Sequence, residues 1–301
     1  MTRPGQPRPT GSEGRRRRDA DAGHGPHAPG QRPAVVVHRG GARCGRRHRA
    51  AGSRRGDAGR GQNGPMQPEE VRAQLRGAVY RGDAVAVVAV LRGGGRWPPD
   101  ALQLIGDGLI AALSGRVPDA AALARACVTE LRDRGWDGDD ELADQLDGLL
   151  GTGPAPLLRA LPVDLEELAG VLEGDPLSGS GRLDLNTGEV WPAAAIEYAR
   201  ETGEEDEDTS EDPDRWLGVQ NTGSRAGYRD MAEFIDTVAD PDRADRLGIA
   251  IQGRGAFRRF KDTLARWPAD LDRWYAFSDD RQRGRARAWL AEEGYRPLAP
   301  P

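Results

Sequence analysis

The residues best suited to binding chemistry in this sequence surround a Gly-Arg-Gly run near its carboxy-terminal end. Gly253 and Gly255 flank Arg254, and glycine reaches backbone conformations that are closed to other residues. A helix is expected to follow, and the free N–H groups and positive dipole end at a helix start attract anions. Arg254 and Arg258 stand four residues apart, so both can reach the same side of that helix start. The pattern predicts an anion-binding site at Gly253, Arg254, Gly255 and Arg258. The simpler alternative is that Gly253 only ends the preceding helix and Arg254 pairs with a nearby acid.

Catalytic patterns are missing from residues 66–301. All four histidines precede this part of the chain, so it lacks the usual zinc ligands and the histidine base of serine and cysteine hydrolases. Cys127 lies on an apolar helical face and is interpreted as a core residue. Lys261 is the only lysine, and Arg259 stands where a nuclease-type motif needs an acid. We therefore predict no catalytic residue, no metal and no cofactor, and the prediction leans toward a protein that is not an enzyme.

Charge is concentrated in two stretches of the carboxy-terminal half. Residues 201–214 hold nine acidic residues and no basic one, which is typical of a solvated loop rather than of a metal site with fixed geometry. Residues 254–287 hold ten basic and five acidic residues. The favoured interpretation of this basic stretch is a set of salt-bridged helix surfaces facing the acidic loop. The alternatives are a surface for an anionic partner and, less favoured, a catalytic site.

Aromatic residues indicate where the main core lies, since thirteen of the sixteen follow position 180 and each buries a large apolar area. Stacking of nucleic-acid bases on some of these rings is the alternative, but their helical spacing favours a core. The predicted aromatic core comprises Trp216, Tyr228, Phe257, Phe260, Trp267, Trp274, Tyr275 and Trp289.

The apolar spacing predicts the elements that position these residues. Five helices are expected within 66–151, although the valines of 84–91 also suit a strand. A Pro/Gly linker at 152–162 precedes a helix that Asp164 caps. A hairpin over 183–191 turns at Asn186, Thr187 and Gly188, and a third strand spans 216–219. The rest is expected to be helical. Helices begin at Ser224, at Pro241, shortly before Phe257 and at Pro268, and a final helix ends near Leu290.

Residues 1–65 differ from the rest in composition, with 15 arginines and 4 acidic residues. Such a segment buries too little apolar surface to fold, so we expect a disordered basic head. The favoured interpretation is that Met66 begins the protein and that this head is an upstream extension. Two cysteines exclude a disulfide framework and favour a cytoplasmic setting, and no apolar run is long enough to cross a membrane.

Several runs of the carboxy-terminal half resemble a known family. They are VDLEEL (163–168), LDLNTGEV (183–190), DRWL (214–217), GYRDM (227–231), GRGAFRRFKD (253–262), RWYAF (273–277) and RARAWL (285–290). In this order they resemble the bacterial uncharacterised protein family 0158 over about residues 163–297. The resemblance implies no particular activity, because that family has none assigned.

These observations predict a mainly α fold with a small antiparallel β element. The expected parts are the head at 1–65, a helical bundle at 66–151, the linker at 152–162 and an α+β domain at 163–297. The function predicted is a non-enzymatic binding or regulatory module that engages a protein or an anionic ligand, with nucleic acid less favoured and no membrane. The alternative is an enzyme acting on a phosphorylated or nucleic-acid substrate with carboxylates and arginines. A deep pocket holding Arg258 beside carboxylates would favour the enzyme, and a shallow basic face would favour the module.

Overall fold

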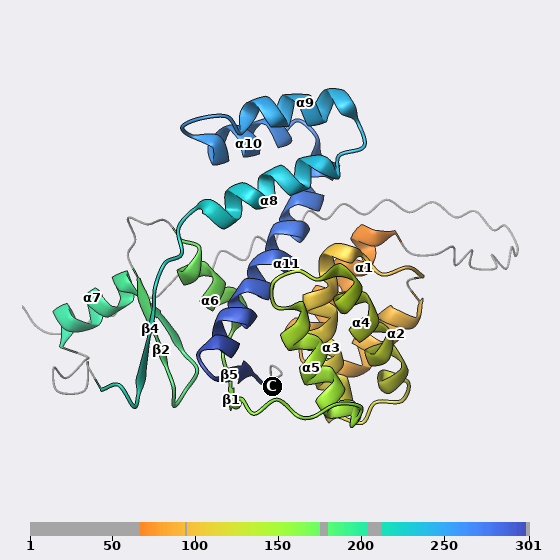
Figure 1. Ribbon diagram of the computed structural model, residues 1–301, viewed down its shortest axis with the longest axis vertical. Helices are drawn as coiled ribbons and strands as arrows, with labels where there is room; N and C mark the ends of the chain where they lie inside the picture. The colour runs from red at the N-terminus through yellow and green to blue at the C-terminus, as the bar shows by residue number, and fades with distance from the viewer. Residues whose placement is uncertain (1–66, 94, 175–179, 204–211, 299–301) are drawn as a thin grey trace, which may run out of the picture. The chain divides into compact units, whose positions relative to one another are not determined.

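The computed structural model describes residues 67–93, 95–174, 180–203 and 212–298 (Figure 1). Within these ranges helices predominate, and short strands form two small sheets. The predicted fold class, mainly α with a small antiparallel β element, is confirmed. The predicted head at 1–65 lies outside the described residues, and so does most of the acidic run.

The first described helices form a bundle around one apolar core. They are α1 (Pro68–Tyr80), α2 (Ala84–Gly93), the 3-10 helix η1 (Pro99–Ala101), α3 (Leu102–Ser114), α4 (Ala120–Arg134) and α5 (Asp139–Leu150). Helical spacing directs Leu75, Ile105 and Leu109 into the core, where they are fully buried. Cys127 lies in the same core, and burial raises the pKa of its thiol above the usual range. The valine-rich segment α2 is a helix rather than a strand.

The β elements follow the bundle along the chain. In order, the next elements are β1 (Arg159–Leu161), α6 (Leu165–Leu172), β2 (Gly181–Asp184), β3 (Val190–Pro192), α7 (Ala193–Thr202) and β4 (Trp216–Val219). Strand β2 is central in an antiparallel sheet, with Leu183 opposite Val190 on β3 and Leu217 on β4. The predicted hairpin and third strand are therefore confirmed. The Asp164 side chain accepts hydrogen bonds from the Glu166 and Glu167 amides, as its capping role requires.

Two strands of three residues each were not predicted. Strand β1 lies within the predicted linker and pairs in parallel with β5 (Tyr295–Pro297), near the last described residues. Strands this short contain no alternation that a sequence pattern can reveal. Helix α7 was also missed, and it begins directly after the strand that Pro192 ends.

The last helices are α8 (Arg225–Asp236), α9 (Pro241–Ala250), α10 (Ala256–Leu264) and α11 (Pro268–Glu292). Their core is an edge-to-face aromatic cluster, in which the rings of Phe260 and Trp274 lie 4.8 Å apart and those of Phe234 and Trp274 lie 5.4 Å apart. Of the other predicted core residues, Trp216, Trp267 and Trp289 are half-buried.

Three residues of the predicted aromatic core are not in it. Tyr228, Phe257 and Tyr275 are 41%, 38% and 47% exposed. The buried face of α10 begins at Ala256, and the next residue, Phe257, lies about 100° further around the helix. The pattern therefore located the right helices but assigned some rings to the wrong face.

Helix α11 is continuous, whereas the sequence pattern predicted two helices in this range. Gly284 does not interrupt α11. At this residue α11 contacts the turn between α4 and α5. A Cβ atom on Gly284 would lie 2.1 Å from the carbonyl oxygen of Asp137. Glycine is therefore required for the two backbones to approach this closely. None of the described helices is long and apolar enough to cross a membrane.

Candidate functional site

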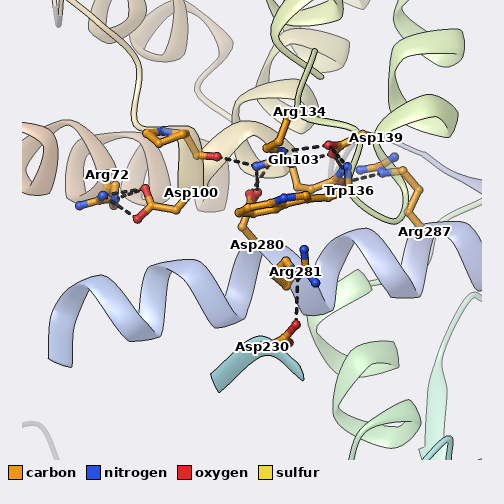
Figure 2. A network of polar contacts seen from close by, with 11 residues as sticks. Arg72, Asp100, Gln103, Arg134, Trp136, Asp139, Asp230, Asp280, Arg281 and Arg287 are labelled. Carbon is orange, nitrogen blue, oxygen red and sulfur yellow. Dashed lines mark hydrogen bonds and ion pairs between the residues drawn. The ribbon is translucent and has the colours of Figure 1, made fainter. Parts of the chain in front are cut away.

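The arginines of α11 face two different sets of carboxylates, and Figure 2 shows one of these contacts, between Arg281 and Asp230. Toward the bundle, Arg283 binds Asp107 of α3 at 3.1 Å, and the fully buried Arg287 binds the other oxygen of the same carboxylate. Toward α8, Arg281 and Arg285 bind Asp230 at 3.0 and 2.7 Å. The arginines of α11 therefore form ion pairs, as predicted. Within the described residues, the acidic partners of these arginines lie on packed helices and not in the acidic loop.

A second polar cluster joins the amino-terminal part of α3 to α11. The buried Asp280 accepts a hydrogen bond from the backbone amide of Gln103 at 2.9 Å and forms an ion pair with Arg134. Arg134 also pairs with Asp139, and its guanidinium lies 4.0 Å from the centre of the Trp136 ring. Burial raises the pKa of Asp280 more than Arg134 lowers it. Because these groups bind one another, they form a structural network rather than an open site.

A hollow of about 670 Å³ lies where the amino-terminal ends of α8 and α10 meet. Its lining consists of Ser224, Arg225, Tyr228, Arg229 and Phe257. No carboxylate belongs to this lining in the part of the chain that the structure describes. We refer to this feature as the α8/α10 hollow.

Packing between the two helices positions the rings of the α8/α10 hollow. Phe234 of α8 and Phe260 of α10 contact edge to face in the core, with ring centres 6.2 Å apart. On the outside, a Cβ atom on Gly227 would lie 3.0 Å from the Phe257 ring, so glycine allows this ring to approach the α8 backbone. Tyr228 follows Gly227 and contributes the second ring of the lining.

The two charged residues that line the α8/α10 hollow, Arg225 and Arg229, are both basic. Arg225 and Arg229 are exposed, and neither forms an ion pair within the described ranges. Neither α8 nor α10 has an acidic residue in its first turn, and no side chain caps either helix. Residues 219–229 and 247–261 contain six basic and no acidic residues. The free amides at two helix starts and the unpaired arginines therefore favour an anion here.

The predicted anion site lies beside the hollow and does not line it. Gly253 and Gly255 adopt left-handed backbone angles, with φ of 76° and 73°. Arg254 and Arg258 are exposed, and Arg258 makes only a 3.8 Å ion pair with Asp262. Whether this loop binds an anion stays a prediction.

Arg259, which the sequence argument did not select, binds the Gly-Arg-Gly loop. It donates hydrogen bonds to the carbonyl oxygens of Ala250, Gln252, Gly253 and Arg254. These bonds satisfy the Ala250 carbonyl at the end of α9 and three carbonyls of the loop that follows. Sequence reasoning also missed Arg225 and Arg229, although an arginine pair four residues apart around an aromatic residue, after a Gly-Ser step, is a visible signal.

A second cavity, of about 380 Å³, lies between α1, α3, α6 and the end of β5. Its walls include Val79, Leu104 and Leu165. The half-buried Arg283 and the buried Asp107 at this cavity already bind each other. In the described ranges, no group of three or more His, Cys, Asp or Glu residues is arranged to hold a metal ion.

Comparisons with known proteins agree with the resemblance drawn from the sequence. Residues 183–300 match the model of the Uncharacterised protein family (UPF0158). The UPF0158 protein PA5073 of Pseudomonas aeruginosa is 28% identical over 142 residues, which make up 47% of this chain and 90% of that protein. No solved structure matches the chain.

The matched region is mainly helical and includes a small sheet. The family whose model it matches is described as uncharacterised. The match at residues 183–300 and the similarity to the Pseudomonas protein agree with the resemblance to the UPF0158 family over this part of the chain. The match contains the whole α8/α10 hollow and all of α11, whereas the bundle lies outside it.

Proposed function

We propose that this chain is a non-enzymatic binding module and that its UPF0158 region takes an anionic ligand at the α8/α10 hollow. The observation that carries this proposal is the unpaired state of Arg225 and Arg229 within the described residues, beside two helix starts free of acidic residues. The chain as a whole is acidic, with a net charge of −5. A local group of basic residues without acidic partners is therefore a specific feature of this surface.

The lining of the hollow supports a module over an enzyme. Among the described residues, Arg258 is exposed, lies outside the hollow and pairs with Asp262, whereas Arg258 beside carboxylates in a deep pocket would have favoured catalysis. Arg225 and Arg229 supply planar donors that suit phosphate or carboxylate oxygens, and the two rings supply apolar walls. The low cysteine content supports a cytoplasmic setting for this module.

Arginine labelling with phenylglyoxal tests this proposal in the full chain. Labelled sites are identified by mass spectrometry with and without inorganic tripolyphosphate. We expect tripolyphosphate to protect Arg225 and Arg229 from labelling. Arg246 and Arg266, which are exposed and without ion pairs among the described residues, are the internal controls and should label equally in both samples. Equal labelling of Arg225 and Arg229 with and without tripolyphosphate would overturn the proposal.

A pair of matched variants gives a second measurement. Arg225→Ala with Arg229→Ala should weaken tripolyphosphate binding at the protected site by at least about tenfold. Arg246→Ala with Arg266→Ala removes the same charge from α9 and from the residues after α10, and should leave that site unchanged. Equal weakening by both pairs would mean that net charge alone attracts the anion, and the hollow would then have no special role.

A further inference from the structure

We infer that the ligand of the α8/α10 hollow is a single-stranded nucleic acid, with phosphates on Arg225 and Arg229 and bases on Tyr228 and Phe257. This inference rests on the proposed function and names the ligand class. It follows from the combination of exposed rings and unpaired arginines in one hollow.

The exposure of the two rings requires an explanation, because the neighbouring rings are packed. Phe234 of α8, Phe260 of α10 and Trp274 of α11 are at most 4% exposed and form the aromatic cluster. Tyr228 and Phe257 are 41% and 38% exposed and line the hollow together. Large apolar side chains that share an open, polar-edged hollow are typical of a binding surface.

The spacing on α8 places two arginines and an aromatic ring on one side of the helix. Tyr228 lies three residues after Arg225, and Arg229 lies four residues after Arg225. Residues at these spacings are neighbours on a helix surface. Single-strand binding sites commonly combine basic side chains for the backbone with aromatic faces for the bases, because every base has a π-face.

The start of α10 carries further positive charge. Arg254 and Arg258 lie on either side of Phe257 in the sequence, and both are exposed. An extended polyanion can contact these arginines as well as those of the hollow, whereas an isolated phosphate cannot. These additional arginines therefore favour a chain of phosphates over a single anionic group.

The rings favour nucleic acid over an acidic peptide or a duplex. An acidic peptide would bind the arginines, but its carboxylates would gain nothing from two aromatic faces. Duplex bases are already stacked on one another, so they are not available to the rings. Unpaired bases use both the arginines and the rings.

Fluorescence anisotropy with a labelled oligothymidylate tests the role of the rings in the full chain. We expect Tyr228→Ala and Phe257→Ala each to weaken binding by about fivefold to a hundredfold, which is the range for loss of one stacked base. Tyr228→Phe keeps the ring and should bind like the parent. Tyr275→Ala removes an exposed ring from α11, outside the hollow, and is the matched control. Phe257→Leu replaces Phe257→Ala if thermal unfolding shows that the alanine variant is destabilised.

Photocrosslinking with the same oligonucleotide carrying 5-iodouracil locates the contact directly. Crosslinks at Tyr228 or Phe257, identified by mass spectrometry, are expected. Crosslinks confined to residues 1–65, where the chain is also rich in arginine, would overturn the inference.

The two proposals fail in distinguishable ways. If tripolyphosphate protects Arg225 and Arg229 while the ring variants bind the oligonucleotide like the parent, the nucleic-acid inference is wrong and the anion site stands. If tripolyphosphate gives no protection and no crosslink reaches the hollow, both are wrong. Equal, ring-dependent binding of a duplex or of oligoglutamate would also overturn the inference.

Discussion

The arginines of α11 and those at the start of α8 belong to the same part of the molecule but have opposite surroundings. Arg283 and Arg287, which we call the bridging arginines, both bind Asp107 of the bundle. Arg225 and Arg229, the hollow arginines, are exposed and have no ion-pair partner among the described residues. The difference shows that an arginine of this protein is structural where a buried carboxylate binds it, and is free to bind a ligand where no carboxylate does.

The two pairs also differ in what their loss would cost. Removing a bridging arginine leaves the Asp107 carboxylate with a missing partner in a mostly buried site. Asp107 then keeps only one of its two arginines, and breaking part of a buried ion-pair network is strongly destabilising. Removing a hollow arginine leaves no charge unpaired, so its effect should be confined to ligand binding.

Arg287→Ala should produce the largest effect. We expect a loss of about 3–5 kcal/mol in the free energy of unfolding, because Arg287 is 1% exposed and also donates to Gln103 and Gln145. Urea unfolding followed by circular dichroism measures this loss. An unfolding midpoint equal to that of the parent would remove the distinction between bridging and hollow arginines.

Gly284→Ala tests the backbone contact that holds the bridging arginines against the bundle. The added methyl group would lie 2.1 Å from the Asp137 carbonyl oxygen, so we expect a loss of about 1–3 kcal/mol. Gly248→Ala on α9 is the matched control, because its Cβ atom would meet nothing within 4 Å. The control should stabilise the protein by up to about 1 kcal/mol, since alanine is the better helix former. Equal effects of both substitutions would contradict the close contact.

Asp184 and Arg215 form an intermediate case, a buried carboxylate with a partly exposed arginine. Burial raises the pKa of Asp184, but hydrogen bonds from the Asn186 and Thr187 amides and from Arg215 outweigh it, so the pKa is lowered. A lowered pKa stabilises the fold above the ordinary aspartate pKa of about 4, and this contribution is lost as the pH falls.

Asp184→Asn should therefore destabilise the protein by about 0.5–1.5 kcal/mol near neutral pH, a small value because Arg215 is partly solvated. Urea unfolding across a pH series gives the difference in unfolding free energy between variant and parent, which should shrink as the pH falls below the ordinary aspartate pKa of about 4. A difference that grows as the pH falls would have the wrong sign for this carboxylate.

Replacement of both hollow arginines by alanine should have the smallest effect on stability. We expect less than about 1 kcal/mol for the pair, because exposed substitutions away from packed features cost little. The same urea titration measures it beside Arg287→Ala. A loss as large as that of Arg287→Ala would mean that Arg225 and Arg229 are structural.

Local features were predictable from the sequence, and contacts between distant residues were not. The apolar spacing of α1 and α3 and the turn residues of the hairpin act within a few positions, so they predicted these elements. The partner of Arg287 lies 180 residues earlier in the chain, and no local pattern connects it to Asp107. The exposure of Tyr228 and Phe257 depended on how α8 and α10 pack, since rotation by one residue moves a ring from the core to the surface.

The bridging contacts also impose an order on the synthesis of the protein. A ribosome completes the bundle, with Asp107 and Asp139, long before it adds Asp280, Arg283 and Arg287. Until α11 emerges, the nascent bundle exposes carboxylates and backbone groups that the finished protein buries, and long-range contacts of this kind form late in folding. A nonsense mutation between the bundle and α11 would therefore release a bundle whose Asp107 lacks both bridging arginines.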